Sequence, residues 1–103
     1  MALMVLVTVP KDKAKNLANI LLQQKVCACV NIVGGLESFF WWEGKIDTET
    51  ESLLIIKTKD AIFSKLEELI KKNHPYSVPE IIGFQIDKIN KSYLDWLNKE
   101  VCD

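Results

Sequence analysis

The sequence contains no arginine, so all 13 of its cationic residues are lysines. Arginine's planar fork is the side chain that proteins favour for clamping phosphate and for reading guanine. The formal net charge is −1, so no field of one sign attracts nucleic acid or an acidic membrane. These features argue against a phosphoryl-transfer enzyme and against nucleic-acid or membrane partners.

Long apolar runs are also absent, since no stretch approaches the roughly 20 residues that a membrane helix requires. The apolar stretch at residues 2–9 is short and has no basic residue before it, unlike a secretory signal. The three cysteines form no disulfide framework. Cys27 and Cys29 would lie roughly 6.5 Å apart on one strand, near the upper limit for a disulfide, so we expect free thiols and a cytoplasmic location.

Catalytic groups are scarce. His74 is the single histidine, which leaves few choices for a general base. No serine, cysteine or carboxylate stands in a recognisable triad or nucleophile elbow. We therefore expect a binding protein that is not an enzyme.

The hydrophobic pattern predicts one α+β domain over residues 1–103, because a chain of this length seldom holds two. Apolar or β-rich runs predict strand segments at residues 2–9, 26–33, 36–42, 46–58 and 80–86, with a turn or bulge at 34–35 between the second and third. Apolar stripes at three- and four-residue spacing predict helices capped by Asp12, Asp60 and Asn90. Asn73 is expected in the left-handed conformation at the end of the second helix.

This element order is that of the ferredoxin-like β-α-β-β-α-β sandwich, with an antiparallel sheet and here an extra C-terminal helix. The helices cover only one face of such a sheet. Phe39 and Trp41 would project from one face of their strand, and Phe40 and Trp42 from the other. We expect a second copy of the chain to cover the open face through a symmetric interface. Alternatively, Trp41, Trp42 and Trp96 form the floor of a ligand pocket.

Three short segments are more specific than this periodicity. They are ACVN at residues 28–31, WWEGKI at 41–46 and HPYSVPEI at 74–81, accompanied by KT at 57–58 and YLDWL at 93–97. In this order and spacing the chain resembles the CutA family of divalent-cation-tolerance proteins over essentially its whole length. The resemblance implies a ferredoxin-like homotrimer, related in fold to the PII signalling proteins, with a link to copper and other divalent metals. It implies no agreed catalytic reaction.

The resemblance also implies metal ligands. Relatives proposed to bind metal use a first-strand cysteine, the cysteine of the ACV segment and an acidic residue in the following hairpin. The last two match Cys29 and Glu49, whereas the first-strand position is Val7, which cannot ligate a metal. Phe40 stands where relatives have a tyrosine. The pattern is incomplete in this chain.

Two patterns in the sequence are compatible either with a metal site or with a structural role. Cys27 and Cys29 on one strand face suit a soft ion such as Cu(I), or they fill the core as small hydrophobic side chains. Asp47, Glu49 and Glu51 alternate along a strand and suit a hard divalent ion, or they form a solvated face that discourages aggregation.

The segment 74–81 gathers imidazole, phenol and carboxylate groups on one irregular loop. The predicted ligand-binding cleft consists of Trp42, Lys57, His74, Tyr76 and Glu80. The alternative for His74 is a cation at a helix C-terminus, and for Lys57 an ion pair in a subunit interface.

Two functions follow. The first is a homotrimer that binds copper or another divalent metal and serves metal tolerance. The alternative is a PII-like trimeric signalling module that binds a small anion between subunits. A scaffold for an unknown protein partner is a third reading.

Overall fold

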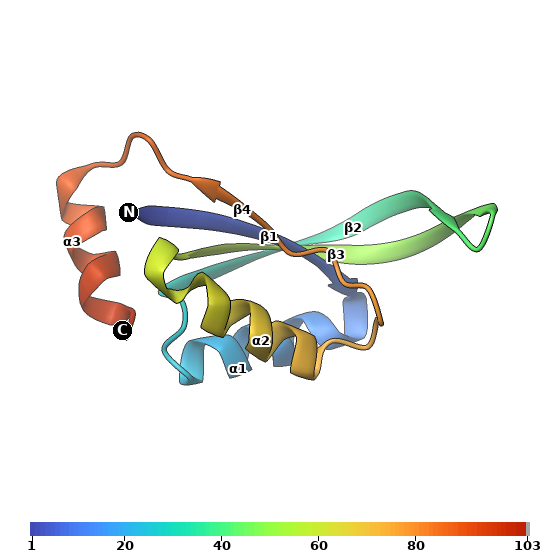
Figure 1. The fold of residues 1–103 in the computed structure, drawn as a ribbon, viewed down its shortest axis with the longest axis horizontal. Coiled ribbons are helices and arrows are strands. Elements are labelled where there is room, and N and C mark those ends of the chain that lie inside the picture. Colours follow the sequence, from blue (N-terminus) through green and yellow to red (C-terminus); the bar gives the residue numbers. More distant parts are fainter. Residues whose placement is uncertain (103) are drawn as a thin grey trace.

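The computed structural model describes residues 1–102 and shows a four-stranded antiparallel sheet with three helices (Figure 1). The strands are β1 (Ala2–Pro10), β2 (Cys29–Trp42), β3 (Lys45–Lys59) and β4 (Ile82–Gln85), in the spatial order β2-β3-β1-β4. The helices are α1 (Ala14–Gln23), α2 (Phe63–Asn73) and α3 (Lys91–Glu100). The ferredoxin-like order and the extra C-terminal helix are confirmed. Asp103, the last residue of the predicted domain, lies outside the described residues.

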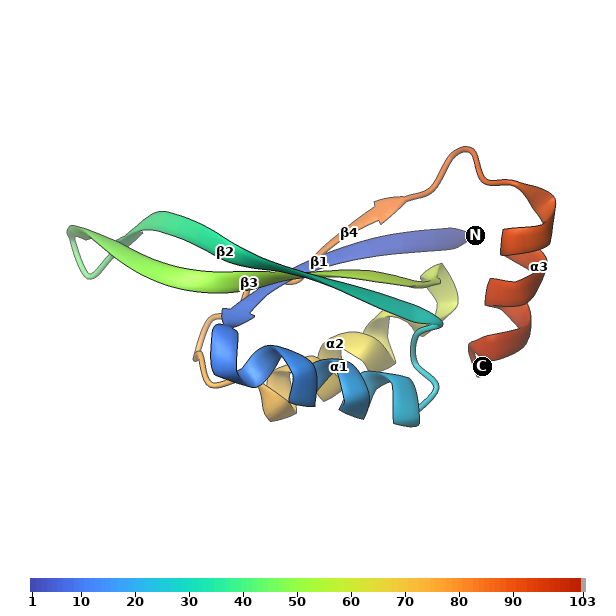
Figure 2. The same ribbon diagram turned by 180° about the vertical axis from the view of Figure 1, so that it is seen from behind.

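The core lies between the sheet and the pair α1 and α2, which cover one face of it (Figures 1 and 2). Alternate residues of β1 and β3 point into this layer, as the two-residue period of a strand requires. Its fully buried members include Val5, Val7, Leu54, Ile56, Leu17, Leu21, Leu66 and Ile70. None of the helices in the described residues is long and apolar enough to cross a membrane.

The opposite face of the sheet is apolar, and residues 1–102 leave it uncovered. Leu6 of β1 and Ile55 of β3 are only half-buried there. Ile82 and Phe84 of β4, which pair with Leu6 and Met4, are 45% and 47% exposed. The predicted uncovered face is therefore present.

β2 and β3 continue beyond the rest of the sheet as a two-stranded arm, residues 36–51 (Figures 1 and 2). The arm begins at a register shift between Val33 and Leu36, where two glycines face one residue of β3. Gly35 has a φ of 74°, a conformation that glycine adopts without strain. Of the two possibilities for this segment, the bulge is the correct one.

The four aromatic residues of the arm alternate as predicted. Trp41 lies opposite Ile46 on one face, and Phe40 lies opposite Asp47 on the other. Phe39 and Trp41 are 69% and 72% exposed, so their face of the arm is largely bare.

Several predicted boundaries and caps are wrong. Asp12 and Asp60 lie within short 3₁₀ turns, and α1 and α2 begin after them without a side-chain cap. Asn90 does occupy the N-cap position of α3, but its amide donates to the Ser92 hydroxyl instead of capping. Asn73 is the last residue of α2 and does not have a positive φ, so it is helical and not left-handed. Its side-chain amide donates a hydrogen bond to the Leu69 carbonyl. β2 begins at Cys29, three residues later than predicted.

Candidate functional site: an acidic, aromatic groove

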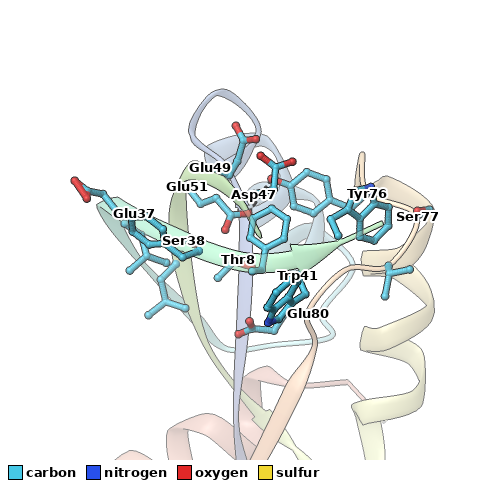
Figure 3. A pocket seen from close by; sticks show the side chains of 16 residues that line it. Thr8, Glu37, Ser38, Trp41, Asp47, Glu49, Glu51, Tyr76, Ser77 and Glu80 are labelled. Atoms are coloured by element: carbon cyan, nitrogen blue, oxygen red, sulfur yellow. Dashed lines mark hydrogen bonds between the residues drawn. The ribbon is translucent and has the colours of Figure 1, made fainter. Parts of the chain in front are cut away.

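An open groove of about 880 Å³ lies where the arm meets the loop that precedes β4 (Figure 3). The charged residues that line it are all acidic: Glu37, Asp47, Glu49, Glu51 and Glu80. Its aromatic lining consists of Phe39, Phe40, Trp41, Trp42 and Tyr76. None of the described lining residues is basic.

Three of the acids come from one row on β3. Asp47, Glu49 and Glu51 alternate with threonines, so they project from the same side of the strand. Asp47 and Glu49 are exposed, as expected of a solvated strand face. Glu51, at the base of the arm, is only 4% exposed, so the solvated-face interpretation does not hold for it.

The buried carboxylate of Glu51 is held by the loop. The Tyr76 hydroxyl donates a 2.8 Å hydrogen bond to Glu51 Oε2. Burial raises the pKa of the Tyr76 phenol above its ordinary value, and the hydrogen bond to Glu51 and the charges of Glu51 and Glu49 raise it further. Tyr76 therefore remains a protonated donor that faces a negatively charged wall.

His74 does not line the groove, but it contacts Tyr76, which does. Its Nδ1 accepts the Tyr76 backbone N–H at 3.1 Å, so the ring proton is on Nε2, which lies 2.8 Å from the Thr8 carbonyl. The two rings pack with centroids 4.9 Å apart. This arrangement defines a neutral imidazole that ties the loop to β1, which disagrees with the alternative of a helix-stabilising cation.

Lys57 lies at the other end of the sheet. Its ammonium group donates a hydrogen bond to the side chain of Asn31. Cys29, which lies two residues before Asn31 on β2, is the cross-strand partner of Lys57. Because Lys57 is six residues beyond Glu51 on β3, it lies roughly 20 Å along the strand from the groove. The predicted cleft is thus divided: Trp42, Tyr76 and Glu80 line one groove, whereas Lys57 and His74 do not.

The two predicted metal ligands are also far apart within one chain. Cys29 pairs with Lys57, and Glu49 stands eight residues earlier on the same strand, which corresponds to roughly 25 Å. Val7 is fully buried on the helix-covered face, opposite to the face from which Cys29 projects. Among residues 1–102, no group of three or more His, Cys, Asp and Glu side chains is arranged to hold a metal ion.

All three cysteines are free, as predicted. Cys27 precedes β2 and is 2% exposed within the core, so it does not share a strand face with Cys29. Burial, with a smaller contribution from Cys29, raises the pKa of the Cys27 thiol to about 12. Cys27 thus matches the alternative of a small core side chain. Burial and the neighbouring Cys29 likewise raise the pKa of the Tyr93 phenol.

The sequence-based cleft missed part of the groove. Glu37 and Ser38 of β2 line it, and Thr8 of β1 forms part of its wall. The alternation of acids on β3 made the exposed row of Asp47 and Glu49 predictable from the sequence. The burial of Glu51 was not predictable, because it depends on a contact with Tyr76, 25 residues away.

Comparison with known proteins identifies relatives along nearly the whole chain. Residues 3–100 match the family described as CutA1 divalent ion tolerance protein. Protein CutA 1, chloroplastic, of Oryza sativa subsp. japonica is 50% identical over 97 residues, covering 93% of this chain and 55% of that protein. The divalent-cation tolerance protein CutA of Thermus thermophilus is 45% identical over 96 residues, covering 92% of this chain and 93% of that protein.

A solved structure agrees with these sequence matches. That of the divalent cation tolerance protein from Thermus thermophilus has a TM-score of 0.96 and 43% identity, covering 99% of this chain and all of that chain. The length of the match differs between relatives. This chain spans about half the length of the matched rice and Arabidopsis thaliana proteins, 55% and 53%.

Proposed function

We propose that this chain, which belongs to the CutA1 divalent ion tolerance family, binds copper or another divalent metal as a homotrimer and serves tolerance of such ions. The observation that carries the proposal is the family match over residues 3–100, with relatives named for divalent-cation tolerance. The proposal includes no catalytic reaction. It also includes a cytoplasmic location, although the rice relative is named as chloroplastic and the Archaeoglobus fulgidus relative as periplasmic.

The uncovered face of the sheet supports the assembly. Leu6, Ile55, Ile82 and Phe84 expose apolar surface there, and removing this surface from water against another copy would favour association. An antiparallel sheet with one bare apolar face is a common element of subunit interfaces.

The separation of Cys29 and Glu49 connects metal binding to assembly. Since roughly 25 Å divides them within one chain, a single ion that uses both must take them from different subunits. Cys29 is half-buried, and its free thiol is a ligand of the kind that copper prefers. The proposed metal site therefore depends on the proposed trimer.

A metal-binding measurement on the reduced protein tests this function. The protein is incubated with copper or zinc, desalted and analysed for metal per chain. Cys29→Ser should lower the copper bound per chain, whereas Cys102→Ser, at an exposed cysteine, should not. Metal content no higher than in a buffer control, or full retention by Cys29→Ser, would count against the proposal.

The alternative, a PII-like trimeric module for a small anion, would need a cation brought by another subunit. The groove of one chain is lined by five carboxylates, and none of its described lining residues has a positively charged side chain. Lys57 lies at the far end of β3 from it. A screen of nucleotides and carboxylate metabolites in which no compound raises Tm would remove this alternative.

A further inference from the structure

His74 joins segments of the protein that lie far apart in the sequence. It directly follows the last residue of α2, and its Nε2 lies 2.8 Å from the Thr8 carbonyl of β1. Its Nδ1 lies 3.1 Å from the backbone nitrogen of Tyr76, whose hydroxyl in turn donates to Glu51 of β3. One imidazole therefore fixes the position of the residue that joins the loop to the arm across the groove.

The two hydrogen bonds of the ring require its neutral form. The Tyr76 N–H can only donate, so Nδ1 is an unprotonated acceptor and the ring proton lies on Nε2. In an imidazolium both ring nitrogens carry protons. The Nδ1 proton would then face the Tyr76 N–H, so two donors would meet without an acceptor between them. Only the bond to the Thr8 carbonyl is compatible with both forms of the ring.

His74 is also buried, with 8% of its surface exposed. A charged side chain in such a position needs hydrogen-bond partners in place of water, and protonation here removes one. Histidine is the side chain whose unperturbed form changes charge between about pH 5 and 8. His74 is the single histidine of the sequence, so a change of its charge can be followed without interference from another imidazole.

The charged groups on the elements around the ring have both signs. Lys71 and Lys72 lie in the last turn of α2, and β1 carries no charged side chain. Glu51 of β3 binds the hydroxyl of Tyr76, and Glu80 follows the loop and lines the groove. Charges of opposite sign therefore act on the imidazole together. The hydrogen bond at Nδ1 is the contact that distinguishes its two protonation states.

We propose that His74 is a pH-sensitive switch that controls the wall of the groove. Protonation at Nδ1 breaks the hydrogen bond to the Tyr76 N–H, and the loop 75–80 moves away from the sheet. Because Tyr76 also carries the hydroxyl that binds Glu51, the same step separates the loop from the base of the arm. The groove is closed on this side in the neutral form and opens on acidification. This inference goes beyond the proposed function, which requires only metal and assembly.

NMR-detected hydrogen exchange of the reduced, metal-free full chain at about pH 5.5 and about pH 7.5 tests the proposal. After correction for the intrinsic effect of pH on exchange, the Tyr76 amide should exchange about fivefold faster at the lower pH, the factor that corresponds to one ordinary hydrogen bond. The amides of α1 serve as the internal reference and should not change. A titration of the ring signals of His74 should have the same midpoint as the change at Tyr76.

Two variants separate the switch from other titrating groups. His74→Asn should keep the Tyr76 amide equally protected at both pH values, because an asparagine oxygen accepts from the backbone two residues on and does not titrate. Glu80→Gln, the matched control, removes a titrating group next to the same loop and should retain the pH effect of the wild type.

Three results would overturn the proposal. They are equal protection of the wild-type Tyr76 amide at both pH values, a pH effect that persists in His74→Asn, and a pH effect that is lost in Glu80→Gln. If His74→Asn does not fold, His74→Gln carries the same test. Metal is absent throughout, so this result and that of the metal-binding measurement are independent.

Discussion

The hydroxyl of Tyr76 donates a 2.8 Å hydrogen bond to Glu51, a carboxylate that is only 4% exposed. Glu51 lies at the base of the arm and Tyr76 on the loop before β4, so this bond joins the two walls of the groove. His74 reinforces the contact, because it binds the backbone of both Tyr76 and Thr8.

Loss of this bond should destabilise the protein. Tyr76→Phe leaves a buried carboxylate without its donor, and we expect the free energy of unfolding to fall by about 1–3 kcal/mol. Glu51→Gln should cost less, because an amide oxygen still accepts from the phenol and no charge is buried. Urea denaturation of the three proteins measures both changes. A Tyr76→Phe protein as stable as the wild type would show that the bond does not contribute.

The bulge at the start of the arm depends on one glycine. Gly35 has a φ of 74°, so Gly35→Ala should destabilise the fold by about 1–2 kcal/mol. Gly34→Ala is the matched control, because no atom lies within 4 Å of a Cβ placed there and its φ is not positive. Thermal unfolding of the two variants should rank Gly35→Ala lower in Tm. Equal Tm values would argue that the left-handed conformation is not required.

Alkaline pH should reveal the buried thiol of Cys27. Burial raises its pKa from 9.0 to about 12, so between these values the unfolded chain has lost a proton that the folded chain keeps. The free energy of unfolding should therefore fall as pH rises through this window, by up to about 1.4 kcal/mol per pH unit for this group. Cys27→Ala should reduce the slope of stability against pH, and Cys102→Ala should not. Identical slopes for all three proteins would contradict the burial of Cys27.

Restoring the first-strand cysteine should not create a metal site within a chain. Val7 is fully buried under the helices, whereas Cys29 projects from the opposite face of the sheet. Val7→Cys should therefore bind as much copper per chain as the wild type, measured on reduced, desalted protein. A gain of one copper ion per chain would show that residue 7 reaches a site that this geometry excludes.

The sequence predicted those parts of the fold that depend on local pattern. The strands β1 and β3 were predicted from their apolar runs, and the helical stripe that buries Leu66 and Ile70 from its periodicity; all three elements recur in the structure. The helix starts at Asp12 and Asp60 did not follow, because a short 3₁₀ turn precedes each helix and moves its first turn past the expected cap.

The candidate site was less accessible to sequence reasoning, because it depends on register. Cys29 and Glu49 belong to different strands, and only the pairing of β2 with β3 shows that they lie at opposite ends of the sheet. Cys27 and Cys29 have strand-like spacing, yet the strand begins at Cys29 and leaves Cys27 in the core. Contacts between distant segments, such as Tyr76 with Glu51, carry no local signal.

Native mass spectrometry of the reduced protein, with and without sub-stoichiometric copper, tests both the assembly and the metal binding, because one spectrum gives the subunit number and the bound metal. We expect a trimer that takes up whole numbers of copper ions per subunit and loses this uptake in Cys29→Ser. A monomer, or a trimer that stays free of metal, would contradict this expectation.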